Sequence, residues 1–453
     1  MKPKILTTLS TYSWRQFATD GQAGVTVALV ALPLSIAIAI ASGAPPAAGL
    51  VTAVVAGFII SALGGSRVQI GGPTGAFIVV VYGVIHAHGY AGLLTATLMA
   101  GGILLIAGAV GAGRLIRHVP EAVVEGFTIG IAIVIAVSQL KDLSGMTGGG
   151  LPAEFIPKLE GLWSLRGSID CEALALGVAC VAGILLLRRL APRVPWLVPV
   201  VIGASLVAAF AMPSVETVAT RYGALPDGLP LPELPALRPA LLIELLPSAL
   251  TIAFLAGIES LLSAMVADRM IEGAHRSRAE LIAQGAANIA SPLFGGLPAT
   301  GAIARTATNV NAGGRTPVAG IVHALAILLA MLLAAPLAGA LALPALAGLL
   351  VVTAWTMAEP HRWPERLRMP RADLAVLVGT AALTVLTDLT LAIAVGTVLG
   401  LLVRAARGEI SPPGWPHIPL FGRRAVKRSE VDEPSSDPAV GEEDARRVQL
   451  PKA

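Results

Sequence analysis

The sequence has little charge. Only 13% of its 453 residues are Asp, Glu, Lys or Arg, whereas 55% are hydrophobic, and an ordinary soluble domain has roughly a quarter charged residues. This deficit excludes a soluble globular protein. The excess of basic over acidic residues gives a net charge of +4, which we attribute to basic loops beside a membrane. No nucleic-acid partner is expected.

Cysteine is also scarce. Cys171 and Cys180 are the only two cysteines, and both fall in one apolar stretch. They exclude a disulfide framework and a cysteine-based metal site, and we interpret them as packing residues. The sequence also has no nucleotide-binding loop, metal-ligand cluster or nucleophile triad. We therefore expect neither enzyme activity nor a cofactor.

Long apolar runs are abundant. Stretches of about 20 residues with almost no charge are long enough to cross a bilayer as helices. Breaks at glycine, proline and arginine divide the chain into about fourteen apolar segments. Their approximate bounds are 22–42, 47–63, 74–86, 91–112, 121–140, 170–190, 195–212, 244–267, 280–294, 300–312, 317–337, 340–357, 372–387 and 389–406. The pattern predicts an all-α polytopic membrane protein.

The third and tenth segments are too short to cross a bilayer. Each follows glycines and a proline and opens on Thr-Gly-Ala, at Gly71 to Ala76 and at Gly295 to Ala302. Each also stands third in its half of the chain, and an odd number of spans per half, about seven, inverts the second half relative to the first. The sequence therefore predicts an inverted repeat with two half-helices.

A helix that begins inside the membrane has free N–H groups and a partial positive charge at its N-terminus. Two such ends that face each other can bind an anion. Arg305, one turn into the second half-helix, either supplies positive charge to that anion or reaches water from the helix end. The predicted anion-binding residues are Thr74, Gly75, Ala76, Thr300, Gly301, Ala302 and Arg305.

Glu259 is the single charged residue in the stretch 250–266. An acid inside the membrane is costly unless it faces a cavity or a partner, so we interpret it as functional. It can take up a proton, or hold Na⁺ in a hydrated cavity. Ser263, four residues on, shares its helical face and can add an oxygen ligand. The predicted cation-coupling residues are Glu259 and Ser263, joined by Thr300 for Na⁺.

Several other charged residues are expected to have structural roles. Glu121 and Glu125 open the fifth segment, where acids complement a helix N-terminus. Asp268 and Arg269 are expected to pair at a helix end. The histidines at 86 and 88 are expected to lie in an outer loop without a role.

The distribution of basic residues predicts the orientation. With a cytoplasmic N-terminus, the outside loops hold only Lys141, Lys158, Arg166, Arg221 and Arg238. The short inside loops are richer in arginine, as the positive-inside rule requires. These are Arg114, Arg117, Arg188, Arg189, Arg193, Arg269, Arg276, Arg278, Arg362, Arg366, Arg368 and Arg371. We expect an inner cell membrane protein with both termini in the cytoplasm.

These assignments divide the chain into five parts. Residues 1–20 form a cytoplasmic N-terminal segment, 21–213 the first repeat, 214–243 an extracytoplasmic loop and 244–407 the second repeat. Residues 408–453 are charged and poor in apolar side chains, so we expect a disordered cytoplasmic tail.

Over about residues 10–407 the sequence resembles the sulfate permease (SulP) family. The matching stretches are Pro33, Gly43-Ala44-Pro45-Pro46, Gly71 to Ala76, Gly126-Phe127-Thr128, Gly130, Ala132, Glu280-Leu281-Ile282, Gln284-Gly285, Asn288, Gly295 to Thr306, Asn309 and Gly313. The resemblance implies seven plus seven inverted spans, divided into a core that carries the site and a gate that holds a homodimer contact. It implies anion substrates such as sulfate, bicarbonate, chloride or dicarboxylates, bound near Thr74, Glu259, Ser263 and Thr300 to Ala302.

The sequence departs from the family pattern in two places. The tail after Arg407 is too short for the STAS domain that members usually carry. Where many sulfate transporters have Pro-Gln, this chain has Pro33-Leu34-Ser35, which resembles the bicarbonate transporter branch. The resemblance to that branch implies coupling to sodium through an aspartate at the position of Glu259. Because this chain has the longer glutamate there, the identities of both the transported anion and the coupling cation stay open.

We therefore expect a secondary active transporter of a small inorganic anion, of the sulfate or bicarbonate type, by symport with H⁺ or Na⁺. We expect membrane lipid to surround the transporter. Alternatives within the family are a dicarboxylate transporter and a passive anion channel or exchanger, and a channel would not need Glu259. A nucleobase permease of the same fold generally has an acid on its tenth helix, where this chain has Arg305.

Overall fold

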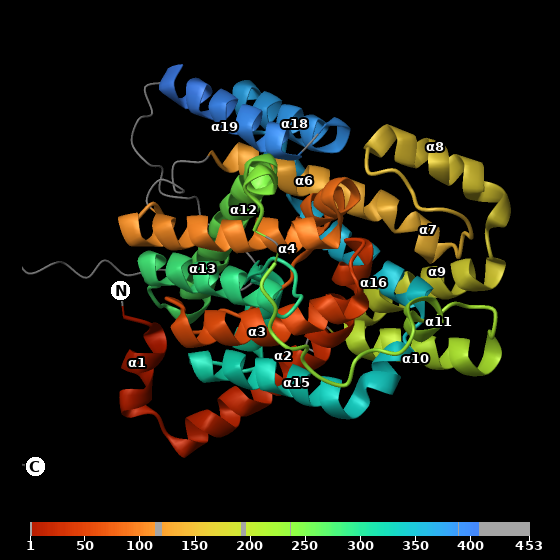
Figure 1. Ribbon diagram of the computed structural model, residues 1–453, viewed down its shortest axis with the longest axis horizontal. Coiled ribbons are helices and arrows are strands. Elements are labelled where there is room, and N and C mark those ends of the chain that lie inside the picture. The colour runs from red at the N-terminus through yellow and green to blue at the C-terminus, as the bar shows by residue number, and fades with distance from the viewer. Residues whose placement is uncertain (1, 114–119, 192–195, 236, 388, 407–453) are drawn as a thin grey trace, which may run out of the picture. The chain divides into compact units, whose positions relative to one another are not determined.

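The structure, a computed structural model, describes residues 2–113, 120–191, 196–235, 237–387 and 389–406. Within these residues the chain is a bundle of α-helices around one two-stranded sheet (Figure 1). The predicted tail at 408–453 and the arginines at 114, 117 and 193 lie outside the described residues.

The first half of the chain supplies strand β1 (Gly71–Gly72), which lies between the second and third predicted segments. Its helices are α1 (Lys4–Thr8), η1 (Leu9–Thr11), α2 (Trp14–Ala41), α3 (Pro46–Leu63), η2 (Gly75–Phe77), α4 (Ile78–Val110), α6 (Glu121–Ser138), α7 (Leu140–Leu143), α8 (Phe155–Leu165), η3 (Arg166–Ser168), α9 (Cys171–Leu190), α10 (Leu197–Ala211) and α11 (Val218–Tyr222).

The second half supplies strand β2 (Thr300–Gly301), which takes up the first two residues of the tenth predicted segment, so the helix there begins later than predicted, at Ile303. Its helices are α12 (Pro239–Ile271), α13 (Ser277–Leu293), α14 (Ile303–Asn311), α15 (Pro317–Gly339), α16 (Leu343–Ala358), η4 (Pro360–Arg362), α17 (Trp363–Arg366), α18 (Arg371–Leu386) and α19 (Leu389–Ala406).

Each predicted apolar segment coincides with one of these helices or with half of one. Helix α4 covers both the third and the fourth segments. Gly89, with φ 68° and ψ 177°, kinks it at the boundary between them. In the described part, eight helices are long and apolar enough to cross a membrane, by length and composition. Helix α8 is new, since the sequence predicted only a loop there. The predicted class, an all-α polytopic membrane protein, is confirmed.

Helix starts follow from local capping chemistry. Ser13, Asp170 and Thr316 precede α2, α9 and α15, and each side chain accepts a backbone N–H from the first turn. Such caps satisfy donors that have no partner inside the helix. Pro317, at the first position of α15, loses no hydrogen bond there, because that N–H would be unpaired in any case.

The two halves meet in the sheet. β1 and β2 pair antiparallel, with Gly71 opposite Gly301 and Gly72 opposite Thr300. Helices α2, α3, α4, α12, α13, α14 and α15 pack around this pair, while α6, α9, α16, α18 and α19 contact one another. The antiparallel pairing places both half-helix starts at one point, as an inverted repeat requires.

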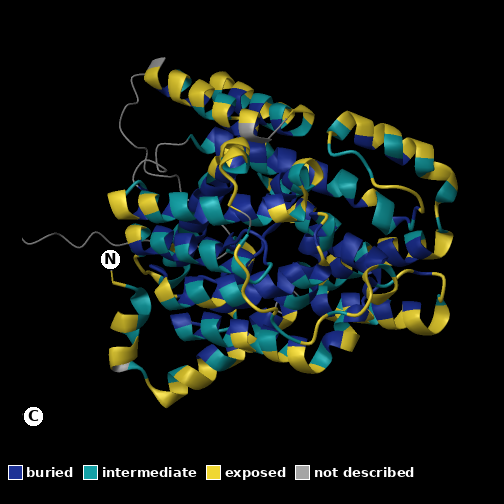
Figure 2. Ribbon diagram, viewed as in Figure 1, coloured by how far each residue is buried: buried dark blue, intermediate teal, exposed yellow. Residues whose placement is uncertain are grey.

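Buried and exposed residues are distributed unevenly among the helices. Figure 2 shows buried residues gathered in the middle of the bundle, whereas α8 and α19 are largely intermediate or exposed. Large apolar side chains such as Phe210, Ile243 and Leu333 are 75–87% exposed. Outward-facing apolar side chains on helices of membrane-spanning length fit a lipid surrounding.

Candidate functional site

The candidate site is built on the β1–β2 pair, where the backbones approach closely. A Cβ on Gly71 would lie 2.3 Å from Ile60 Cδ1, and one on Gly72 would lie 2.5 Å from Arg305 Nη1. Gly72 also has a φ of 145°, which side chains disfavour. These glycines are therefore required by the close packing of the Ile60 and Arg305 side chains against β1, which explains the glycine pair of the first motif.

Each half-helix begins within three residues of the end of its strand. Thr74 precedes η2, and Ala302 precedes α14. The Ala302 N–H donates to the carbonyl of Ile70, just before β1, over 2.9 Å. The first N–H groups of each half-helix lack partners within the helix. The structure thus brings the two predicted anion-binding stretches, at 74–76 and 300–302, to one buried place.

Helix α12 contacts both half-helices through one face. Thr74 Oγ1 donates to Glu259 Oε2 over 3.0 Å. Ala256 lies one turn before Glu259, and its carbonyl accepts the Thr300 hydroxyl over 2.9 Å. Ser263, one turn after, has its Oγ 3.4 Å from Thr306 Oγ1. The predicted cation-coupling helix therefore faces the anion-binding stretches.

The three oxygens predicted to hold Na⁺ have separate partners in this conformation. Glu259 contacts Thr74, Ser263 contacts Thr306, and Thr300 donates to Ala256. Within the described residues, no group of three or more His, Cys, Asp or Glu side chains is suited to a metal ion. A cation at Glu259 would therefore be held by one carboxylate together with hydroxyl and carbonyl oxygens.

Arg305 lies behind the strand pair and is 2% exposed. Its Nη2 donates to the Pro73 carbonyl, so a residue of the second half-helix holds the entrance of the first. Its Nε and Nη1 are buried and have no hydrogen-bond partner in the described structure. Burial argues against the alternative in which Arg305 reaches water. The free donors leave the guanidinium able to bind an anion.

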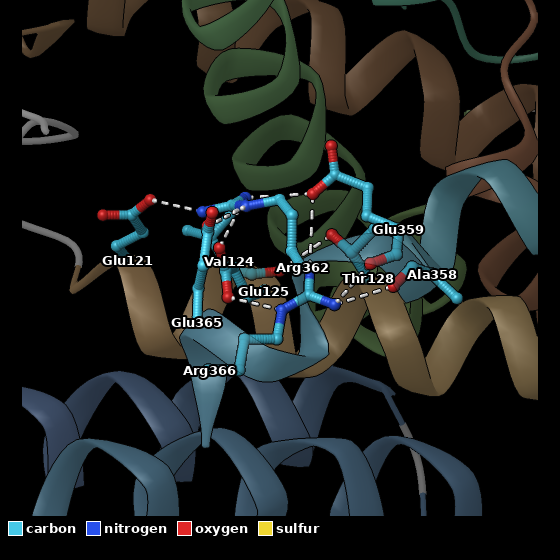
Figure 3. A network of polar contacts seen from close by, with 9 residues as sticks. All are labelled: Glu121, Val124, Glu125, Thr128, Ala358, Glu359, Arg362, Glu365 and Arg366. Carbon is cyan, nitrogen blue, oxygen red and sulfur yellow. Dashed lines mark hydrogen bonds and ion pairs between the residues drawn. The ribbon is translucent and has the colours of Figure 1, made fainter. Parts of the chain in front are cut away.

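Glu125 differs from its predicted role as a helix N-terminal acid. It lies in a network of ion pairs (Figure 3), with its oxygens 2.8 Å from Arg362 Nη1 and 3.0 Å from Arg366 Nε. Glu359 lies 2.9 Å from Arg362 and 3.3 Å from Arg366. The cap interpretation is wrong for Glu125, which joins α6 to η4 and α17. Glu121 does open α6, and it lies 3.7 Å from Arg362.

Two smaller expectations are also corrected. Asp268 pairs with His275, at 2.6 Å between Oδ2 and Nδ1, rather than with Arg269. The turn after α12 brings the histidine back toward the helix end. His86 and His88 lie on α4 and not in a loop, and His88 Nδ1 lies 3.6 Å from Glu244 Oε1 on α12.

Two polar residues next to the site were not predicted from the sequence. Glu280 and Gln69 are fully or almost fully buried, at 0% and 4% exposure, and hydrogen-bond to each other. In the sequence, Glu280 stands out only within a stretch that matches the family. An acid in the first turn of a polar helix is otherwise typical of a solvent-exposed helix N-terminus. Gln69, a glutamine five residues before the Thr-Gly-Ala motif, gave no signal in the sequence.

The chain matches known proteins over most of its length. The profile of the Sulfate permease family matches residues 17–380. The putative sulfate transporter YvdB of Bacillus subtilis is 41% identical over 389 residues, which cover 86% of this chain and 73% of that protein. The bicarbonate transporter BicA of Picosynechococcus sp. is 33% identical over 397 residues, which cover 84% of this chain and 69% of that protein.

A solved structure has the same fold. The transmembrane domain of a cyanobacterial bicarbonate transporter, BicA, superposes with a TM-score of 0.76 at 29% identity, covering 86% of this chain and 98% of that one. The chain therefore has the fold expected from the resemblance to the sulfate permease family. The expectation that the chain is a transporter and not an enzyme is confirmed too, because its relatives are transporters. This polytopic membrane protein belongs to the sulfate permease family.

Proposed function

We propose that the protein is a secondary active transporter that takes up a small inorganic anion, of the sulfate or bicarbonate type, together with H⁺ or Na⁺. One observation carries the proposal: two half-helix N-termini meet at the β1–β2 pair, beside the partly buried Glu259 carboxylate. The printed names of the relatives, a putative sulfate transporter and a bicarbonate transporter, support this class of anion.

The proposed anion site consists of Thr74, Gly75, Ala76, Thr300, Gly301, Ala302 and Arg305. The free N–H groups at both helix starts supply hydrogen bonds and partial positive charge. Arg305 adds a full positive charge and two unpaired donors. Sulfate and bicarbonate both present several oxygens to such donors, so this chemistry suits either oxyanion.

The proposed coupling depends on repulsion between Glu259 and the anion. Both are negative, and their repulsion is strong where water is excluded. A proton or Na⁺ on Glu259, with Ser263 and Thr300 as further oxygen ligands for Na⁺, removes that repulsion. Each ligand then raises the affinity for the other by the same factor. A passive channel needs no such linkage, and a nucleobase permease of this fold generally has acids on both the eighth and tenth helices, whereas the tenth helix here has Arg305 and no acid.

The remaining parts of the proposal concern the arrangement in the cell. We place the protein in the inner membrane with both termini in the cytoplasm, following the arginine-rich loops. We assign residues 21–213 and 244–407 to the two repeats, separated by an extracytoplasmic loop at 214–243. A homodimer through the gate is proposed from the family resemblance.

Uptake into proteoliposomes tests the proposed function. The purified protein is reconstituted and offered radiolabelled sulfate, bicarbonate, chloride and a dicarboxylate, with Na⁺ and proton gradients imposed separately. We expect accumulation of sulfate or bicarbonate above equilibrium, driven by one of the two gradients. Uptake that only equilibrates under both gradients would indicate a channel or exchanger and would overturn the symport proposal.

A further inference from the structure

Glu280 is a fully buried carboxylate in the first turn of α13. Its Oε2 accepts the backbone N–H groups of Gly65 and Ser66 at 2.9 and 3.2 Å. These two residues lie in the stretch that leads from α3 to β1. A Cβ on Gly65 would lie 2.1 Å from the Arg276 carbonyl, so the loop lies directly against the start of α13.

The other oxygen of Glu280 faces the site. Its Oε1 accepts three side-chain donors: Ser260 Oγ at 2.9 Å, Gln69 Nε2 at 3.1 Å and Gln284 Nε2 at 2.9 Å. In the described part of the chain, no basic side chain pairs with this carboxylate. Its charge is thus held by hydrogen bonds alone, which a buried carboxylate requires.

Gln69 connects Glu280 to both strands. It lies two residues before β1, and its Nε2 also donates to Ser260 Oγ over 2.9 Å. A Cβ on Gly301 would lie 1.6 Å from the same Nε2, so the amide is packed directly against β2. Ser260 directly follows Glu259 on α12. One amide therefore contacts the second half-helix entrance, the coupling helix and Glu280.

The corresponding loop in the other half is held by a neutral group. Thr52 on α3 accepts the Leu297 N–H, in the loop before β2, at 2.6 Å. Thus α3 helps to hold the loop of the second half, to which Asn288 and Ser291 of α13 also hydrogen-bond, and α13 holds the loop of the first half. The comparison indicates that holding a loop does not require a charge. What Glu280 adds is reach, because its second oxygen extends to Gln69 and Ser260.

We propose that Glu280 is a positioning residue for anion binding. Through Gln69 it fixes β1 against β2, and so fixes the separation of the two half-helix N-termini that would face the anion. The inference rests on the proposed function, in which the anion binds between those ends. Glu280 itself contacts neither the anion nor the coupling cation.

Glu280→Gln and Gln69→Met test this inference, with Gln284→Met as the matched control. Both glutamines donate to the same carboxylate oxygen, but Gln284 lies one turn along α13 and reaches neither strand. We expect Glu280→Gln and Gln69→Met to raise the KM for radiolabelled sulfate or bicarbonate by about tenfold, the scale of one lost hydrogen bond to a charged group. The maximal rate per monodisperse protein should stay within about twofold, and Gln284→Met should resemble wild type.

The double variant Glu280→Gln/Gln69→Met separates positioning from general damage. Residues that act through one another give non-additive effects, so we expect its KM to match that of Glu280→Gln alone. A multiplied KM would overturn the inference. So would an unchanged KM in both single variants, or an equal rise in Gln284→Met. If Glu280→Gln does not purify as a monodisperse protein, the comparison of Gln69→Met with Gln284→Met decides.

The opposite loop provides a second comparison. Thr52→Val removes the acceptor for the Leu297 N–H, while Thr52→Ser keeps it. We expect Thr52→Val to raise the KM and Thr52→Ser to restore it. Wild-type protein that transports none of the tested anions would refute the proposed function. Wild-type transport with KM values insensitive to Glu280 and Gln69 would refute only the positioning role.

Discussion

Thr74 donates its hydroxyl hydrogen to the carboxylate of Glu259 over 3.0 Å, although 185 positions separate the two residues in the chain. Thr74 stands at the start of the first half-helix, and Glu259 lies on α12 in the second half of the chain. The contact therefore links an anion-binding candidate directly to the cation-coupling candidate. A change in the charge of Glu259 would therefore alter the hydrogen bond to Thr74, at the start of the first half-helix.

Glu259→Gln should separate binding from coupling. The amide keeps the shape of the side chain and can still accept the Thr74 hydroxyl, so we expect normal folding and retained anion binding. It cannot cycle between charged and neutral forms, so concentrative uptake should be lost. Uptake in proteoliposomes, with and without an imposed gradient, measures this. Undiminished gradient-driven accumulation would rule out the coupling role.

Arg305→Ala should weaken anion binding by about 1–3 kcal/mol, the usual scale for a hydrogen bond to a charged group. Arg305→Lys should recover part of this loss, since the charge returns without the planar guanidinium. Binding is measured on monodisperse protein, because the substitution also removes the contact with the Pro73 carbonyl. Tight binding by the alanine variant would leave Arg305 only that contact.

Gly75→Val and Gly301→Val should both abolish anion binding, for partly different reasons. A Cβ on Gly75 would lie 3.2 Å from Met357 Sδ, beside the first half-helix start, whereas a Cβ on Gly301 would collide with Gln69. Gly83→Ala is the control, since a Cβ there meets nothing within 4 Å. If both valine variants bind and transport normally, the anion does not lie between these helix ends.

Glu125→Gln should destabilise the protein more than Glu365→Gln. Removing one partner of a buried ion pair costs about 3–5 kcal/mol, because the other charge is left buried and unpaired. Arg366 is 2% exposed, whereas the Glu365 side chain is 60% exposed, and its pair with Arg362 is expected to contribute little. Thermal unfolding in detergent compares the two variants. Equal unfolding temperatures would mean that the network is not a major source of stability.

Sequence patterns predicted local features better than distant pairings. The two Gly-rich motifs and the short segments after them identified both half-helices, because the backbone geometry is encoded in adjacent residues. The pairing of Gly71 with Gly301 required the folded chain. Glu125 was misinterpreted for the same reason, since its partner Arg366 lies 241 positions away. Glu280 resembles an ordinary acid at a helix start, and only the folded chain brings the loop before β1 onto its carboxylate.

Anion affinity at two cation concentrations tests the central claim most directly. The dissociation constant of sulfate or bicarbonate is measured for wild type and Glu259→Gln, at low and high Na⁺ and at two pH values. Because the proposed repulsion between Glu259 and the anion is removed by a bound cation, wild type should bind the anion more tightly when the Na⁺ or H⁺ concentration is raised. Glu259→Gln should bind with the same affinity under all four conditions. An equal cation dependence in both proteins would contradict the account.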